Sequence, residues 1–257
     1  MSNCVCEINI KRPCWDCVKE AYEEINTASP NDENLQERFK LGILEEAKWR
    51  GGISKTEAKG VADIESKKID CISARFAMVG GMPLLERIRY LNFFGKSPDY
   101  GNYANTCTLQ VSYALNKSNM FLENYMPLDK SKRDANFEKA LILQGGDKHN
   151  YFLRVKEIVM LLKLRKVWGS ADKPYTSKTM YSKQENIDFY HNEFFRLNKK
   201  GVVAMKIRGW REEYGHITLW GGSNVGFVDY KQEEANNFLV DRGENIVVEI
   251  FDFWELK

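Results

Sequence analysis

Cys107 and His216 are the two residues whose local sequence best suits nucleophilic catalysis. Cys107 opens the stretch 106–116, whose apolar residues recur on one helical face. The partial positive charge at a helix N-terminus stabilises a thiolate, which is the nucleophilic form of cysteine. His216 follows Gly215 and begins the strand-like stretch 216–220, and the first residue of a core strand is held rigidly, as a general base must be. The pair could therefore cleave an acyl bond, although each could instead be a packed core residue.

The order of these two residues along the chain is that of papain-like cysteine hydrolases, which use a third polar group to orient the imidazole. The remaining histidines are His149, in a polar segment, and His191, on a predicted helix. We interpret both as structural. Cys71 has no comparable activating context and is predicted to be buried.

Four cysteines, Cys4, Cys6, Cys14 and Cys17, crowd the start of the chain. They could bind zinc, but the spacing between the two pairs is irregular for a zinc knuckle. Buried thiols on the first helix, or disulfides formed in an oxidising compartment, are the alternatives.

Hydrophobic periodicity places the helices early in the chain and the strands late. Helices are expected over 13–25, 35–47, 84–94, 106–116, 151–168 and 187–197, and strands over 202–207, 216–220 and 246–254. The lysine-rich stretch 54–68 is interpreted as a solvated face. This order predicts an α+β fold in which helices pack on an antiparallel sheet formed mainly by the C-terminal third.

Composition excludes several classes of protein. The 257 residues carry a formal net charge of only +2 and are 43% hydrophobic, so a sizeable core is expected but no charge-driven binding to nucleic acid. No apolar run is long enough to span a membrane, and the first residues hold no apolar block of signal-peptide length. We expect neither membrane insertion nor export by the general secretory route.

The sequence motifs around Cys107 and His216 resemble those of a known family. Residues 105–116 read NTCTLQVSYALN and residues 215–222 read GHITLWGG. They are similar to the blocks N-x-C-x-x-x-x-S-x-x-L-N and G-H-I/V-x-L-W-x-G of the type VI secretion amidase effectors of the fourth family. Further agreement lies in Arg12-Pro13-x-Trp15, in the stretch 151–169 and in the final residues 253–256.

Two features depart from the family pattern. The stretch from about 27 to 95 is longer than the family places between its first helix and its cysteine, so we regard it as an insertion within a single domain over 1–257. The family also has an aspartate where this chain has Phe227. We favour Asp229 as the acid, because a longer turn over 222–228 would let its carboxylate accept the Nδ1 proton of His216. Asn224 is the alternative, and Asp229 would then be an exposed turn residue.

The resemblance implies a papain-like fold and a cysteine amidase that cleaves peptidoglycan stem peptides between γ-D-glutamate and meso-diaminopimelate. It implies Cys107, His216 and Asp229 as the catalytic residues, and no metal or organic cofactor. Asn105, Trp220 and Arg208 are the positions that we expect to border the substrate, with Arg211 as another cation near the His216 strand.

The resemblance also implies where the protein acts and with what. We expect delivery by a type VI secretion apparatus into the periplasm of a target cell, and a dedicated immunity protein in the producing species. Two alternatives stay open, namely another papain-fold cysteine hydrolase or transferase, such as a protease or deamidase, and a non-catalytic wall-binding module.

Overall fold

The computed structural model describes residues 12–94, 106–209, 215–229 and 237–257. Within these ranges it is an α+β structure, as predicted. None of the described helices combines the length and the hydrophobicity that crossing a membrane requires.

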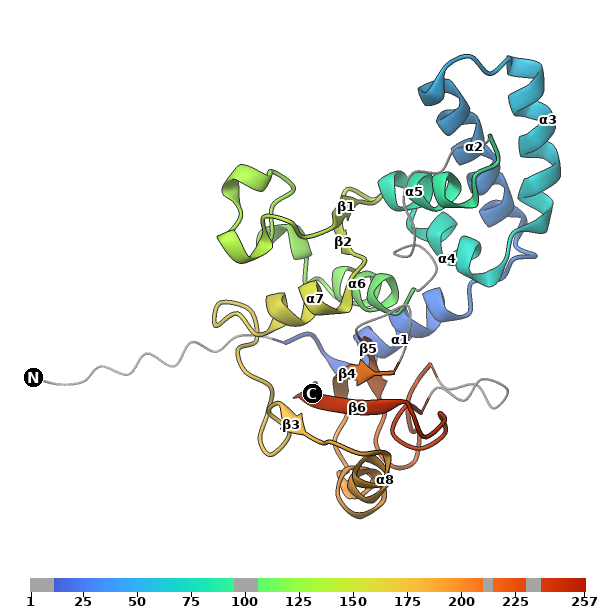
Figure 1. The fold of residues 1–257 in the computed structure, drawn as a ribbon. Coiled ribbons are helices and arrows are strands. Elements are labelled where there is room, and N and C mark those ends of the chain that lie inside the picture. The colour runs from blue at the N-terminus through green and yellow to red at the C-terminus, as the bar shows by residue number, and fades with distance from the viewer. Residues whose placement is uncertain (1–11, 95–105, 210–214, 230–236) are drawn as a thin grey trace, which may run out of the picture.

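A four-stranded antiparallel sheet in the last third of the chain organises the fold (Figure 1). Its strands run in the order β3 (Lys178–Thr179), β6 (Val247–Glu255), β4 (Gly201–Arg208) and β5 (Gly215–Trp220). Met205 is in register with Phe251 of β6 on one side and with His216 of β5 on the other. Strand β5 therefore lies at the end of the ladder and carries His216 there.

Successive residues of these strands face two separate hydrophobic cores, as the two-residue period of a strand requires. Val202 and Ala204 join one core with α1 (Trp15–Asn26), α6 (Cys107–Lys117) and α7 (Val155–Leu162), whereas Val203 and Met205 join the other with α8 (Lys183–Asn192). Figure 1 shows α1, α6 and α7 on one side of the sheet and α8 on the other.

Residues 27–94, which belong to the stretch 27–95 that we regard as an insertion, form a helical unit at the upper right of Figure 1. Its helices are α2 (Glu33–Arg50), α3 (Lys55–Glu65), α4 (Cys71–Val79) and α5 (Gly81–Leu91). Phe39, Phe76 and Ile88 of this unit are fully or almost fully buried in the same core as Cys107. A Cβ on Gly42 would lie 2.6 Å from Cδ1 of Ile88, so the glycine lets α2 and α5 pack closely.

Residues 54–68 are mostly exposed, as expected of a solvated face, and α3 also buries Ala58 and Ala62 against α2. Two other expectations are wrong. Cys71 is exposed at the first turn of α4 rather than buried. The helix expected from residue 151 begins only at Val155.

A short hairpin replaces the start of that predicted helix. Strands β1 (Ile142–Gln144) and β2 (Asn150–Phe152) pair antiparallel, so Tyr151 and Phe152 are extended. An apolar run this short fits a buried strand as well as a helix, and only its pairing partner decides between them.

Candidate active site

Cys107 is the first residue of α6, as predicted, and is only 4% exposed. Helix α6 is buried along most of its length. Two of its polar side chains form hydrogen bonds with the backbone of neighbouring segments. The Ser112 hydroxyl accepts a hydrogen bond from the backbone N–H of Phe152 at 3.1 Å. The Asn116 side chain donates to the carbonyl of Asn150 and accepts from the N–H of Leu122, both at 3.0 Å. The serine and asparagine of the cysteine block thus fix the helix that presents the thiol.

His216 forms a buried ion pair with Asp229. Its Nε2 lies 2.7 Å from Oδ2 of Asp229, and the two residues are 6% and 8% exposed. From the sequence we expect the Asp229 carboxylate to bind Nδ1 of His216, but in the structure it binds Nε2. Nδ1 is therefore the ring nitrogen left for another partner. Nδ1 has no partner at ordinary hydrogen-bond distance among the described residues.

A turn after β5 brings Asp229 to His216. The N–H of Val225 and the N–H of Gly226 both bond to the carbonyl of Gly222, and the chain then returns antiparallel to β5 through a bridge between Phe227 and Trp220. Continuing this pairing by two residues places Asp229 opposite Thr218 and on the same face as His216. Phe227 is buried in the aromatic core, so the acid lies two residues later. Asn224 is exposed in the turn, and the alternative that it orients His216 is wrong.

Charge in the site favours a protonated imidazole. Burial by itself lowers the pKa of His216, but the charge and hydrogen bond of Asp229, together with the neighbouring Cys107, raise it well above its ordinary value. Helix α6, which begins with Cys107, packs directly against β5, and the thiol raises the pKa of the ring. Because Nε2 is engaged by Asp229, Nδ1 is the nitrogen available to Cys107.

Tyr22, Thr218 and Phe238 enclose this group, and sequence reasoning missed all three. The Tyr22 hydroxyl lies 3.3 Å from Oγ1 of Thr218. Burial, then the Asp229 charge and a smaller influence of Cys107, raise the pKa of Tyr22 well above its usual value. The Phe238 ring lies 4.8 Å from the imidazole, centroid to centroid. Only the fold brings these residues together, because they come from α1, β5 and the segment after residue 236.

The predicted substrate contacts have different outcomes. Asn105 and Arg211 lie outside the described residues. Trp220 is fully buried and packs 4.5 Å from the Phe194 ring, so its side chain has no surface to offer a substrate. Arg208 is exposed, and its guanidinium binds the Glu249 carboxylate at 3.0 Å and the Tyr181 carbonyl at 2.9 Å.

The other candidate groups have structural partners. His149 lies 2.7 Å from a carboxylate oxygen of Glu123 and stacks on Phe121, and His191 is exposed. Cys14 and Cys17 form a disulfide at the start of α1, whereas Cys4 and Cys6 lie outside the described residues. No group of three or more potential metal ligands occurs among the residues that the structure describes.

Comparison with known proteins identifies the family. The model of type VI secretion system amidase effector protein 4, Tae4, matches residues 103–248, a range that holds Cys107, His216 and Asp229. The chain belongs to the Tae4 family. It is thus an amidase effector of type VI secretion, and this membership implies a peptidoglycan-degrading antibacterial activity. Residues 27–95 of this effector lie wholly outside the matched range.

Solved structures support the fold of the effector. It resembles Tae4 in the Tae4–Tai4 effector–immunity complex from Enterobacter cloacae, with 18% identity, a TM-score of 0.53, and 96% of this chain and 100% of that chain covered. Tae4 from Salmonella typhimurium bound to the E. cloacae immunity protein gives 17% identity and a TM-score of 0.52 over the same shares. At such identities the likeness shows the fold alone. No curated protein sequence matches the chain.

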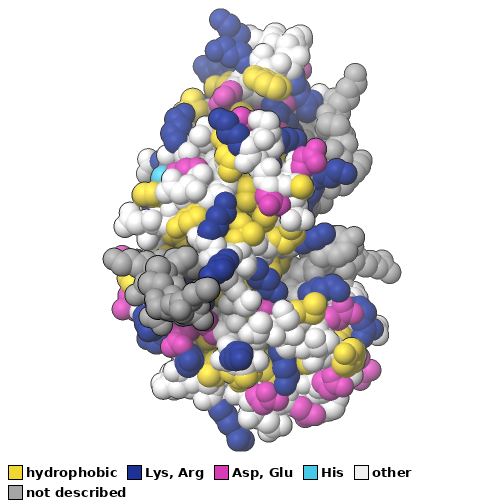
Figure 2. Space-filling model, turned by 90° about the vertical axis from the view of Figure 1, so that its left-hand side faces the viewer, with side chains coloured by type: hydrophobic (Ala, Val, Ile, Leu, Met, Phe, Trp, Pro, Cys, Tyr) yellow, Lys and Arg dark blue, Asp and Glu magenta, His cyan; other side chains and the backbone are white. Residues whose placement is uncertain are grey.

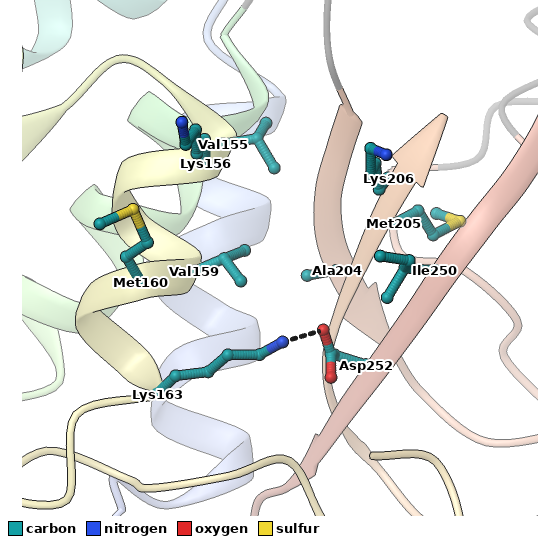
Figure 3. Close-up of a pocket in the computed structure, with 10 residues that line it drawn as sticks. All are labelled: Val155, Lys156, Val159, Met160, Lys163, Ala204, Met205, Lys206, Ile250 and Asp252. Atoms are coloured by element: carbon teal, nitrogen blue, oxygen red, sulfur yellow. Dashed lines mark ion pairs between the residues drawn. The ribbon is translucent and has the colours of Figure 1, made fainter. Parts of the chain in front are cut away.

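A groove on the effector is lined by other residues than Cys107, His216 and Asp229 (Figure 3), although Met205 in its wall is in register with His216. It has a volume of about 580 Å³ and separates α7 from strands β4 and β6. Val159 and Ile250 line its apolar walls, and an ion pair of 2.7 Å between Lys163 and Asp252 crosses one end. Figure 2 shows a molecular face on which hydrophobic and basic side chains gather near the middle.

Proposed function

We propose that the effector is a cysteine amidase that cleaves peptidoglycan stem peptides between γ-D-glutamate and meso-diaminopimelate. The observation that carries the proposal is the buried group formed by Cys107 on α6, His216 on β5 and Asp229 on the returning chain. A thiol at a helix start, next to an imidazole that a carboxylate keeps charged, is the arrangement that activates cysteine for acyl transfer.

The reaction follows from the roles of these groups. The Cys107 sulfur attacks the amide carbon, and the resulting oxyanion accepts hydrogen bonds from backbone N–H groups at the start of α6. His216 gives its proton to the leaving amine, so the C–N bond breaks and a thioester forms. Water then attacks the thioester while His216 takes a proton from it, which releases the carboxylic acid and restores the thiol–imidazole pair.

The start of α6 suits the oxyanion role. Thr106 is the N-cap residue, but its side chain makes no capping hydrogen bond. The first N–H groups of a helix have no partner within the helix. The Thr106 side chain therefore does not accept hydrogen bonds from the first N–H groups of α6, and these groups can donate to the oxyanion of the tetrahedral intermediate.

We further propose a setting for the effector. Delivery by the type VI apparatus would place it in the oxidising periplasm of the target cell, a setting that suits the Cys14–Cys17 disulfide. Family relatives are solved in complex with the immunity protein Tai4, so a cognate immunity protein is proposed for this chain as well. The whole of 1–257 is treated as one amidase domain, because residues of the 27–95 segment share a core with Cys107.

Digestion of purified sacculi tests the proposal. Wild type should release products cut at the γ-D-glutamyl–diaminopimelate bond, identified by mass spectrometry of the muropeptides. Cys107→Ala and His216→Ala should each lower the rate by ~10³-fold or more while keeping the fold. Undiminished cleavage by Cys107→Ala would eliminate the mechanism, and cleavage of a different bond would leave another papain-fold hydrolase. A folded wild type that binds sacculi without cutting them would indicate a wall-binding module.

A further inference from the structure

We propose that Arg75, on α4 of the 27–95 segment, is a positioning residue for Cys107. Its guanidinium joins Thr106, the residue before the nucleophile, to the end of α1. The inference rests on the proposed function, since it assigns a role around the same thiol. It gives the 27–95 segment a part in catalysis although that segment lies outside the range matched by the family.

The contacts of Arg75 are specific and reach two elements. Nη1 donates to Oγ1 of Thr106 at 2.9 Å, and Nη2 donates to both the backbone carbonyl and Oδ1 of Asn26 at 3.1 Å. Asn26 is the last residue of α1, where the helix dipole favours a cation. A planar guanidinium with several fixed donors can join two such sites at once, which an ammonium group cannot do with the same geometry.

A fourth residue closes the network within α6. Gln110 donates from Nε2 to Oδ1 of Asn26 at 2.8 Å, and its backbone N–H makes the first helical bond to the Thr106 carbonyl at 2.8 Å. Asn26, Thr106 and Gln110 are 7%, 3% and 3% exposed. Buried polar groups that satisfy one another hold a single arrangement, so this network fixes how the first turn of α6 leaves α1.

The same contacts determine what Thr106 does with its hydroxyl. Serine and threonine at an N-cap commonly accept a hydrogen bond from the helix N–H groups. Here the hydroxyl is bound to Arg75 and makes no capping bond. Arg75 thereby keeps the N–H groups beside Cys107 available to the oxyanion and holds the thiol in line with His216.

Arg75 differs from the two arginines of α5, which form salt bridges. Arg87 pairs with Asp70, and Arg89 pairs with Glu46. Within the described part of the chain Arg75 forms no salt bridge, and it donates hydrogen bonds to neutral oxygens of Asn26 and Thr106. Its charge also acts on Tyr22, beside Asp229 and Cys107. Arg75 thus binds Thr106, the residue next to Cys107, and the end of α1 rather than the other helices of the 27–95 segment.

The test compares Arg75→Met with Arg38→Met. Arg38 lies in the same segment but is exposed, and among the described residues its side chain donates only to the Met78 carbonyl. With soluble muropeptides as substrate, Arg75→Met should lower kcat by ~30-fold at a KM within about twofold of wild type, because a misplacement near 1 Å costs up to ~10²-fold. The rate of Cys107 alkylation by iodoacetamide, followed by peptide mass mapping, should fall as well. Arg38→Met should leave both rates unchanged.

A folded Arg75→Met protein with kcat within about threefold of wild type would overturn the inference, as would an equal loss in Arg38→Met. Should Arg75→Met not fold, Thr106→Val removes the same contact from the other side and must show the same loss of kcat; wild-type kcat in that variant would also overturn it. Cys107→Ala separates the two proposals. If that variant stays active, the proposed function fails, whereas an inactive Cys107→Ala beside a fully active Arg75→Met defeats only the role of Arg75.

Discussion

Replacing Asp229 with alanine should convert His216 from a charged to a neutral residue. The carboxylate oxygen lies 2.7 Å from Nε2, and both groups are almost fully buried. Breaking a buried pair ordinarily costs about 3–5 kcal/mol, since one charge stays behind without compensation. Histidine avoids most of this cost at neutral pH by releasing its proton, so the remaining loss is that of one buried hydrogen bond, about 1–3 kcal/mol.

The pH dependence of this loss follows from the direction of the shift. In the wild type the folded pKa of His216 is raised, so its contribution to stability is complete below the unfolded value of about 6.5 and is lost as the pH rises through the folded pKa. In the variant both contributions of Asp229 are gone, and burial, which is the largest single cause and lowers the folded pKa, is opposed only by Cys107. The folded pKa therefore falls, and the stability that the raised pKa supplied at low pH is lost. The difference in unfolding free energy should therefore grow as the pH falls from 8 to 5.

Urea denaturation of both proteins at several pH values measures this difference, and NMR titration of the imidazole measures its pKa directly. Catalytic efficiency, kcat/KM, should fall by ~10³-fold or more, because the base loses both its orientation and its charge. Asp229→Asn is the matched control, since an amide can accept from Nε2 but carries no charge. It should keep more activity than Asp229→Ala. A difference in stability that does not change with pH, or an unchanged His216 titration in Asp229→Ala, would refute the reasoning.

Three further substitutions test the framework around the site. Ser112→Ala should cost about 1–3 kcal/mol in urea denaturation, because the buried N–H of Phe152 loses its acceptor; an unchanged midpoint would show that this bond does not matter. Glu46→Ala should cost about 3 kcal/mol by the same method, since Glu46 is 2% exposed and pairs with Arg50 and Arg89; Glu45→Ala, on the same helix, is its control. Trp220→Ala should cost about 3–5 kcal/mol through the cavity left in the aromatic core, and the specific activity of its folded fraction should stay near that of wild type.

The sequence points to Cys107 and His216 as candidate catalytic residues because each is marked by its neighbours. A helix start and a strand start are local features, and glycine or a capping residue next to each makes them visible. Asp229 was predicted with the wrong ring nitrogen, because the direction of the imidazole depends on how β5 packs between two cores. That packing is not encoded within a few residues.

Contacts between distant segments were beyond sequence reasoning. The bond from Arg75 to Thr106 joins two stretches separated by the length of α5 and the residues that follow it. Helix α4 was missed because its apolar residues form a nearly continuous run without clear periodicity. Trp220 matched a family position and still proved to be a core residue, since a tryptophan in a strand packs as readily as it binds.

The hairpin that carries both His216 and Asp229 has a consequence for refolding. His216 and Asp229 belong to one short stretch of chain that turns back on itself, whereas the sulfur arrives on a helix from the other layer. Contacts of low sequence separation close sooner than distant ones. During recovery from denaturant, the imidazole should acquire its carboxylate neighbour before the helical layer docks, and hydrolytic competence should therefore return later than the burial of the hairpin.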